Sequence, residues 1–320
     1  LSDFTTASQS LFQHPTVKFI SVNVCARDAF KMGALPIVGD ARESLKALTV
    51  AVHKKKLKPN QKYLSEVSDA KGKWEDRLER EVFHKFPGEL LNDGQLTKIL
   101  FEESKSGDIA VGASSSLVGN LLRMWDATKL RPSFLEFGYS CMGYELPAGL
   151  GTRMALNGGE VYVCMGDGTY LMNPMELVTA VQEGLKVTVI VSVNQGYQCI
   201  LAHQLHRVGH SFGNEFRRRD PKTNRLEGDF LTIDYAKNAE SLGACAWRVK
   251  TEDELRSALR EARAEIAPCV IVAETEKYRY TPASDLWWDV SVAEVSDDPV
   301  TKGLRKQYED EVNRFQRFYY

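Results

Sequence analysis

The sequence lacks the features that would direct a chain to membranes, nucleic acids or oxidising compartments. No apolar run reaches the roughly 18 residues of a membrane span, and the N-terminal residues carry no signal-peptide pattern. The formal net charge of −2 gives no basis for binding nucleic acid or an anionic membrane. The six cysteines form no Cys-x-x-Cys pair, which indicates free thiols rather than a disulfide framework. We therefore expect a cytoplasmic protein that binds neither nucleic acid nor membrane.

The 320 residues, 43% of them hydrophobic and 26% charged, suffice for more than one globular domain. Short apolar runs alternate with amphipathic helical patterns over residues 90–281, which predicts a doubly wound α/β domain with a parallel sheet. Residues 1–57 contain too few elements for a complete sheet of this kind, so they indicate the end of another domain. Residues 58–89 form a linker and a charged helix. Residues 282–320 form an aromatic-rich tail that we expect to pack on a neighbouring surface, either of this chain or of another.

The individual elements follow from the same patterns. Helices are predicted over residues 41–52, 63–83 and 172–183. Strands are predicted over residues 17–24, 35–38, 109–113, 134–136, 161–165, 187–193, 246–249 and 270–274.

Two polar motifs follow adjacent predicted strands of the large domain. Gly166-Asp167-Gly168 comes after one strand, and Asn194-Gln195-Gly196 comes after the next. In α/β sheets, ligands bind at the carboxyl ends of the strands. The side-chain oxygens of Asp167 and Asn194 and a loop carbonyl at Gly196 are hard ligands that suit Mg²⁺ or Ca²⁺. The glycines at 166 and 168 allow backbone N–H groups to approach a phosphate closely. A lone Gly-Asp-Gly is more often a tight turn, but the two motifs together favour a metal–diphosphate site.

These motifs match the fingerprint of thiamine diphosphate-dependent enzymes, in which Asp, Asn and a backbone carbonyl hold the metal. On that resemblance, Asp167, Asn194 and Gly196 are the Mg²⁺ ligands. Many members have a second Asn just before the ligand, and this chain has Val193 there instead. The liganding Asn is retained.

A third segment, residues 138–151 (GYSCMGYELPAGLG), is similar to the family segment that receives the two rings of the cofactor. The resemblance implies that the Ser140 carbonyl accepts a hydrogen bond from the aminopyrimidine. It also implies that Met142 is the apolar wedge that bends the cofactor. The ordinary alternative for Met142 is core filling. Cys141 would then lie close to the cofactor.

Within this family, the chain most resembles the inositol-catabolic trihydroxycyclohexane-dione hydrolases. The resemblance implies a cofactor-binding domain preceded by the end of a Rossmann-like central domain. It implies hydrolytic ring opening of a cyclic polyhydroxy-1,2-dione, with thiamine diphosphate and Mg²⁺ as cofactors. It is carried by residues 21–24 (SVNV), 33–41 (GALPIVGDA), 135–145 (LEFGYSCMGYE), 238–244 (NAESLGA) and 287–290 (WWDV).

The family's activating Glu lies on a pyrimidine-binding domain, and no Glu of this chain can be assigned that role. The catalytic residue is therefore unknown from this sequence. We expect the chain alone to be inactive. It would need a second chain that carries the missing domain, in a hetero-oligomer built on a dimer or tetramer, or it is a truncated product of a longer chain.

Two other functions stay open. One is a thiamine diphosphate-dependent decarboxylase or carboligase subunit acting on a 2-keto acid, and the other is a non-catalytic subunit that binds the cofactor only in a complex.

Several side chains have two interpretations. Ser116 either belongs to a helix cap or contacts the diphosphate, and Thr169 is the better diphosphate contact because it follows Gly168. The three histidines His203, His206 and His210 fit a zinc site, a substrate contact or an ordinary loop, and the loop is the most frequent case.

Overall fold

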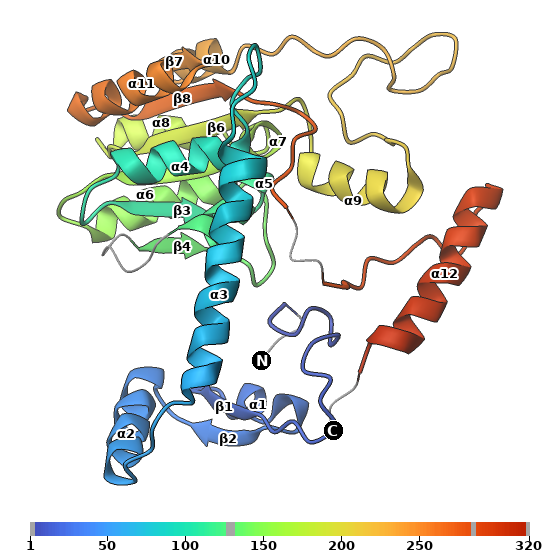
Figure 1. Cartoon of the computed structure of the whole chain (residues 1–320). Coiled ribbons are helices and arrows are strands. Elements are labelled where there is room, and N and C mark those ends of the chain that lie inside the picture. Colours follow the sequence, from blue (N-terminus) through green and yellow to red (C-terminus); the bar gives the residue numbers. More distant parts are fainter. Residues whose placement is uncertain (1–3, 126–131, 283–285, 318–320) are drawn as a thin grey trace. The chain divides into compact units, whose positions relative to one another are not determined.

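The computed structural model describes residues 4–125, 132–282 and 286–317 of the chain. The chain divides into two compact units (Figure 1). The smaller unit comprises Leu1–Glu75 with Ala283–Tyr320, and the larger comprises Asp76–Pro282. Among the helices of the described ranges, none combines the length and apolar character needed to cross a bilayer.

The smaller unit contains a two-stranded parallel sheet in which Ile20 pairs with Leu35. The segment before this sheet contacts the C-terminal tail. The Ser10 hydroxyl donates to the Trp287 carbonyl at 2.9 Å, and the rings of Phe4 and Trp288 lie 5.4 Å apart. The tail tryptophans are thus in contact with this chain's own N-terminal segment. The elements are β1 (Ile20–Asn23), α1 (Ala26–Ala29), the 3₁₀ turn η1 (Lys31–Gly33), β2 (Leu35–Val38), α2 (Ala41–Lys54) and α12 (Pro299–Phe315).

The larger unit is built on a six-stranded sheet in the order β4-β3-β5-β6-β8-β7, with every neighbouring pair parallel. The predicted parallel α/β fold is therefore confirmed. The chain places β4 on one side of β3 and β5 on the other, so the winding reverses between β3 and β5. The strands are β3 (Ile109–Gly112), β4 (Ser133–Leu135), β5 (Val161–Gly166), β6 (Thr188–Val193), β7 (Cys245–Val249) and β8 (Cys269–Glu274).

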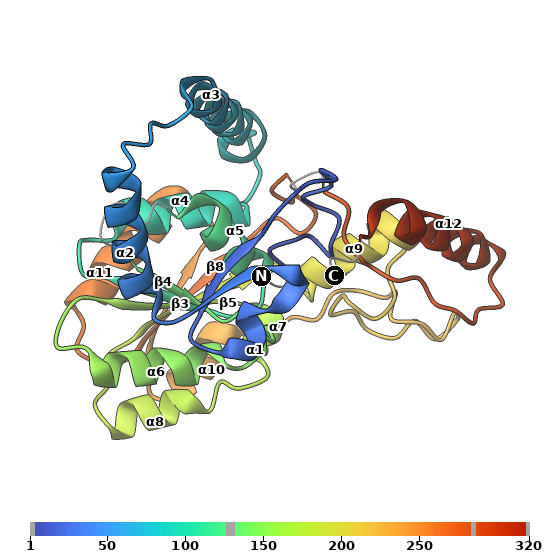
Figure 2. The ribbon, with the colours of Figure 1, turned by 90° about the horizontal axis from the view of Figure 1, so that it is seen from below.

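Helices cover both faces of this sheet because successive strand side chains point to opposite faces. Val161, Val163 and Met165 of β5 pack with α6, α8 and α10. Tyr162 and Cys164 of the same strand pack with α4, α5 and α11 on the other face. Figure 2 shows α6 and α8 along one face, with α4 and α11 along the other. The helices are α4 (Asp93–Glu103), α5 (Ser116–Met124), α6 (Glu145–Ala155), α7 (Asp167–Tyr170), α8 (Glu176–Gln182), α9 (Gln198–Val208), α10 (Tyr235–Ser241) and α11 (Glu252–Ala264).

Two predicted helices differ from the observed ones. The prediction of a helix over 172–183 is wrong at its start, since α8 begins at Glu176. The cause is Pro174, which disfavours helical geometry at the residue before it. The helix predicted over 63–83 is α3 (Gln61–Leu78) followed by a π-helical turn, η2 (Glu79–Phe83).

Candidate active site

The carboxyl ends of β3, β5 and β6 lie side by side at the edge of the sheet where the winding reverses. This is the usual place for a ligand in an open α/β sheet. Gly166 at the end of β5 pairs with Ser192 near the end of β6. Asp167 and Asn194 therefore leave adjacent strands at the same edge, as the two motifs predicted.

Asp167 is a fully buried carboxyl without an ion pair. Its side chain is 0% exposed. It accepts hydrogen bonds from the backbone N–H groups of Gly168 at 2.8 Å and Gln195 at 2.7 Å. Burial raises the pKa of Asp167 to about 7, and these hydrogen bonds offset only part of that effect. No cationic side chain among the described residues pairs with it.

The turn that carries Asn194 has a backbone that only glycine accommodates at one position. Gly196 has a φ of +150°, and a Cβ atom there would lie 2.2 Å from the carbonyl oxygen of Asn214. The Tyr197 N–H donates to the same carbonyl at 2.8 Å. Asn194 is buried, and its own carbonyl accepts from the Gln198 side chain at 2.8 Å. Its amide side chain makes no hydrogen bond within the described part of the chain.

These observations fit a divalent cation. A buried carboxyl without a cation is costly unless a ligand completes it. Mg²⁺ would supply the positive charge for Asp167 and take the Asn194 oxygen as a hard ligand. The backbone carbonyl of Gly196 would be the third ligand of the metal.

Two further predicted residues come together on the segment after β3. Ser140 has a φ of +53°, and its hydroxyl donates to the Ala113 carbonyl at 3.0 Å. The Thr169 hydroxyl donates to the Ser114 carbonyl at 3.2 Å. Met142 is half-buried, two residues beyond Ser140. The crossovers after β3, β4 and β5 are thus joined, and the cofactor roles of these residues remain predictions.

Ser116 is not itself the helix cap, and its contact with the diphosphate stays a prediction. The helix cap is Ser115, whose hydroxyl accepts from the Val118 N–H at 3.1 Å. The Ser116 hydroxyl donates to the buried carboxyl of Asp93, and so does the hydroxyl of Ser192. Burial raises the pKa of Asp93, and the two serine hydrogen bonds lower it less. Sequence reasoning missed Asp93, whose only local signal is its place after the helix cap Asn92.

Comparison with known proteins identifies the family of the chain. Residues 111–273 match the model described as the C-terminal thiamine pyrophosphate binding domain of thiamine pyrophosphate enzymes. The chain belongs to the thiamine pyrophosphate enzyme family. The resemblance drawn from the sequence is therefore confirmed.

Curated relatives of this family member carry the name 3D-(3,5/4)-trihydroxycyclohexane-1,2-dione hydrolase. One from Clostridium botulinum is 36% identical over 92% of this chain and 49% of its own length. Another from Bacillus cereus, hydrolase 1, is 35% identical over 99% of this chain and 52% of its own length. The chain thus spans about half the length of these relatives.

A solved structure shows the same fold for a thiamine pyrophosphate enzyme. The thiamine diphosphate-dependent 4-hydroxybenzoylformate decarboxylase of Rhodococcus jostii RHA1 superposes with a TM-score of 0.51. It shares 22% identity and covers 62% of this chain and 34% of its own. At this identity the likeness supports the fold and carries no argument about substrate.

The three histidines do not form a loop cluster. His203 and His206 lie on helix α9, and His210 follows the left-handed Gly209 that ends this helix. The loop interpretation was therefore wrong for the first two. No group of three or more His, Cys, Asp or Glu side chains suited to a metal occurs in the described ranges, so these histidines gain no support as a zinc site. Cys141 is exposed, next to Met142.

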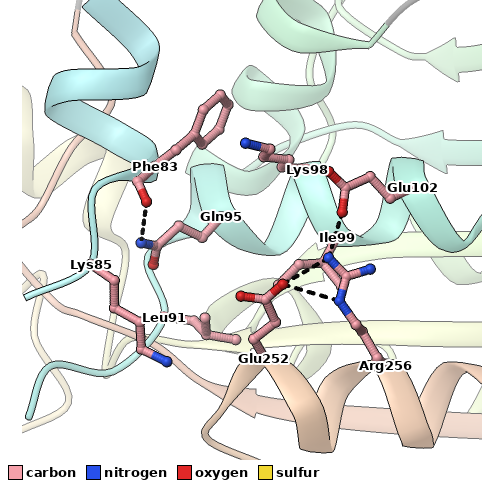
Figure 3. Close-up of a pocket in the computed structure, with 9 residues that line it drawn as sticks. All are labelled: Phe83, Lys85, Leu91, Gln95, Lys98, Ile99, Glu102, Glu252 and Arg256. Carbon is pink, nitrogen blue, oxygen red and sulfur yellow. Dashed lines mark hydrogen bonds and ion pairs between the residues drawn. The ribbon is translucent and has the colours of Figure 1, made fainter.

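A separate pocket of about 200 Å³ lies between α4 and α11 and contains none of the predicted cofactor residues. Two of its cations, Lys98 and Arg256, form ion pairs, and Figure 3 shows those of Arg256 with Glu102 and Glu252. Arg256 binds Glu102, Glu103 and Glu252. Lys98 pairs with Glu79 and lies over the Phe83 ring. The lining residues are Phe83, Lys85, Leu91, Gln95, Lys98, Ile99, Glu102, Glu252 and Arg256.

Proposed function

We propose that this chain is the cofactor-binding half of a thiamine diphosphate- and Mg²⁺-dependent hydrolase. Its substrate would be a cyclic polyhydroxy-1,2-dione, and the reaction would belong to inositol catabolism. The observation that carries the proposal is the buried pair Asp167 and Asn194 at the ends of β5 and β6. It occurs in a chain that is 36% identical to a named dione hydrolase.

In this proposal each predicted residue has one task. Asp167, Asn194 and the Gly196 carbonyl hold Mg²⁺. The backbone at Gly166 and Gly168, with Thr169, receives the diphosphate. Ser140 and Met142 orient the two rings. Ser116 acts indirectly, through its hydrogen bond to Asp93.

Bound thiamine diphosphate supplies a nucleophilic carbon and an electron sink for cleavage of a C–C bond next to a carbonyl. The described residues bind, bend and shield it. Addition of water across the bond between the two carbonyls converts the ring into one open-chain acid. No carbon is lost, which distinguishes this reaction from decarboxylation.

We further propose that a second polypeptide, or another part of a longer one, completes both the site and the smaller unit. The two-stranded sheet of that unit leaves Ile20, Leu35 and Val38 63%, 65% and 53% exposed. Parallel strands are normally buried on both faces. A polypeptide that adds parallel strands to β1 or β2 would cover these side chains and would bring the missing activating Glu.

The test is native mass spectrometry of the full chain with thiamine diphosphate and Mg²⁺, followed by assay of the assembly on cyclic diones. We expect one cofactor per chain and a second polypeptide in the active assembly. Ring opening without CO₂ release supports the hydrolase. CO₂ release from a 2-keto acid would replace it with a decarboxylase. Full turnover by the chain alone would contradict the need for a partner.

A further inference from the structure

Glu145, the first residue of α6, is a buried carboxylate that the proposed function does not use. Its side chain is 0% exposed. It has no ion pair within the described part of the chain. Its position in the middle of the ring-binding segment 138–151 makes the surrounding contacts informative.

Each oxygen of Glu145 accepts a hydrogen bond from a different loop. Oε1 accepts from the Ser114 N–H at 2.9 Å. Oε2 accepts from the Gly143 N–H at 3.0 Å. Ser114 follows β3, and Gly143 lies in the loop after β4. One side chain therefore joins the crossovers after β3 and β4. Ser114, in the first crossover, lies 31 residues before Glu145.

Further hydrogen bonds hold the same two segments, to each other and to the segment after β5. Ser140 donates to Ala113 at 3.0 Å. Asn173 donates to the Gly143 carbonyl at 3.3 Å. Thr169 donates to the Ser114 carbonyl at 3.2 Å. Both backbone polar groups of Ser114 are thus hydrogen-bonded: its N–H donates to Glu145, and its carbonyl accepts from Thr169.

We propose that Glu145 is a positioning residue that fixes the Ser140–Gly143 loop against the end of β3 and so sets the place of the cofactor rings. This inference rests on the proposed function. The start of a helix needs no acidic side chain that also reaches a loop 31 residues earlier, and a neutral side chain of this length supplies only one carbonyl oxygen. The carboxylate is required because it offers two acceptors to two N–H groups.

The chain contains a matched control at the opposite edge of the sheet. Asp108 is 1% exposed and also accepts from two backbone N–H groups, those of Lys105 at 2.6 Å and Glu160 at 2.9 Å. It lies before β3, away from all predicted cofactor residues. Asp108→Asn therefore makes the same chemical change in a similarly buried site.

The experiment compares wild type, Glu145→Gln and Asp108→Asn as full chains. Backbone hydrogen–deuterium exchange is measured by mass spectrometry, and binding of thiamine diphosphate with Mg²⁺ is measured by calorimetry. In Glu145→Gln one N–H loses its acceptor, so exchange should rise in residues 113–116 and 139–144. Cofactor affinity should fall about 10-fold, as for other residues that orient a ligand. Both variants should lose thermal stability, whereas Asp108→Asn should keep wild-type affinity and wild-type exchange in those segments.

Unchanged exchange at residues 113–116 and 139–144 in Glu145→Gln would overturn the inference, as would an equal loss of affinity in Asp108→Asn. The Glu145→Asp variant adds a second check, because it keeps the charge but loses reach to one N–H. It should resemble Glu145→Gln rather than wild type. A wild-type chain that binds no cofactor would overturn the proposed function and the effect of Glu145 on the cofactor rings, whereas the exchange data would still decide whether Glu145 joins the loops.

Discussion

Buried carboxyl groups differ in their partners between the two ends of the strands of the large sheet, called here the amino edge and the carboxyl edge. At the amino edge, Asp108 pairs with Arg263, and Glu160 pairs with Lys186. At the carboxyl edge, Asp93, Glu145 and Asp167 are buried with no cationic partner in the described part of the chain. The same sheet therefore has one edge whose buried carboxyls are paired with cations and one edge whose buried carboxyls, within the described residues, are held by hydrogen bonds alone.

The pKa shifts follow this division. Burial alone would raise the pKa of Asp108, but hydrogen bonds and the charge of Arg263 lower it overall. Burial raises the pKa of all three carboxyls at the other edge. The comparison teaches that burial alone does not mark a binding site. Burial without a compensating charge makes a carboxyl a candidate for a ligand or a positioning role, because such a group costs stability.

The largest expected effect comes from breaking the amino edge. Arg263→Met removes the cation that binds Asp108 and donates to the Tyr162 hydroxyl at 2.8 Å. Asp108 would remain buried without a charge partner, so the free energy of unfolding should fall by about 3 kcal/mol. Urea denaturation measures this loss, and cofactor affinity should be unchanged. Altered affinity would show that the two edges are not independent.

The next largest effect is expected at the carboxyl edge, on cofactor affinity. Asp167→Asn removes the charge that the metal would balance, so affinity for thiamine diphosphate with Mg²⁺ should fall roughly 100-fold, or about 2.7 kcal/mol. Asp108→Asn serves as the control with the same chemical change. Calorimetry on both variants decides the point. If Asp167→Asn and Asp108→Asn bind the cofactor with equal affinity, Asp167 is not a ligand of the metal.

A smaller effect should follow from Gly196→Ala. The new Cβ would meet the Asn214 carbonyl, and the backbone conformation at +150° is strained for any other residue. We expect a loss of about 1–3 kcal/mol in stability together with weaker cofactor binding. Gly184→Ala is the control, since φ is +61° there but no atom lies within 4 Å of the added Cβ. It should lose stability and keep affinity.

The smallest effect is the pH dependence of the amino edge. The folded-state pKa of Asp108 lies below its ordinary value of 3.8. Its contribution to stability is therefore present above about pH 4 and is lost as the pH falls through the folded-state pKa. Asp108→Asn should be less stable than wild type by about 1 kcal/mol at pH 7, and the difference should narrow toward pH 3. Denaturation at both pH values measures this, and a constant difference would contradict it.

Local patterns predicted the strands well because a buried parallel strand is a short apolar run. The run predicted over 161–165 is β5 (Val161–Gly166), and the one over 187–193 is β6 (Thr188–Val193). Asp167 and Asn194 were found because each directly follows such a run. Helix α9 was missed, although Gly209 with a φ of +78° is a common helix-ending signal.

The positioning residues were not predictable because their partners are distant in sequence. Ser192 lies 99 residues from Asp93, and Ser114 lies 31 residues from Glu145. These pairs meet only once the strand order is known, and a single sequence does not give that order. A buried carboxyl also has no local pattern that distinguishes it from an exposed one.

The bridge between Gly196 and Glu215 has a consequence for how this scaffold could diversify. It closes a loop that contains α9, because the bridge holds the two ends of residues 196–215 together. We call this bridge the neck of the loop. Lengthening a closed loop costs only about 0.6 kcal/mol of entropy for each doubling. Insertions near Phe212, which is 73% exposed, should therefore leave the neck and Asn194 in place. The same neck could carry loops of different length while the end of β6 stays unchanged.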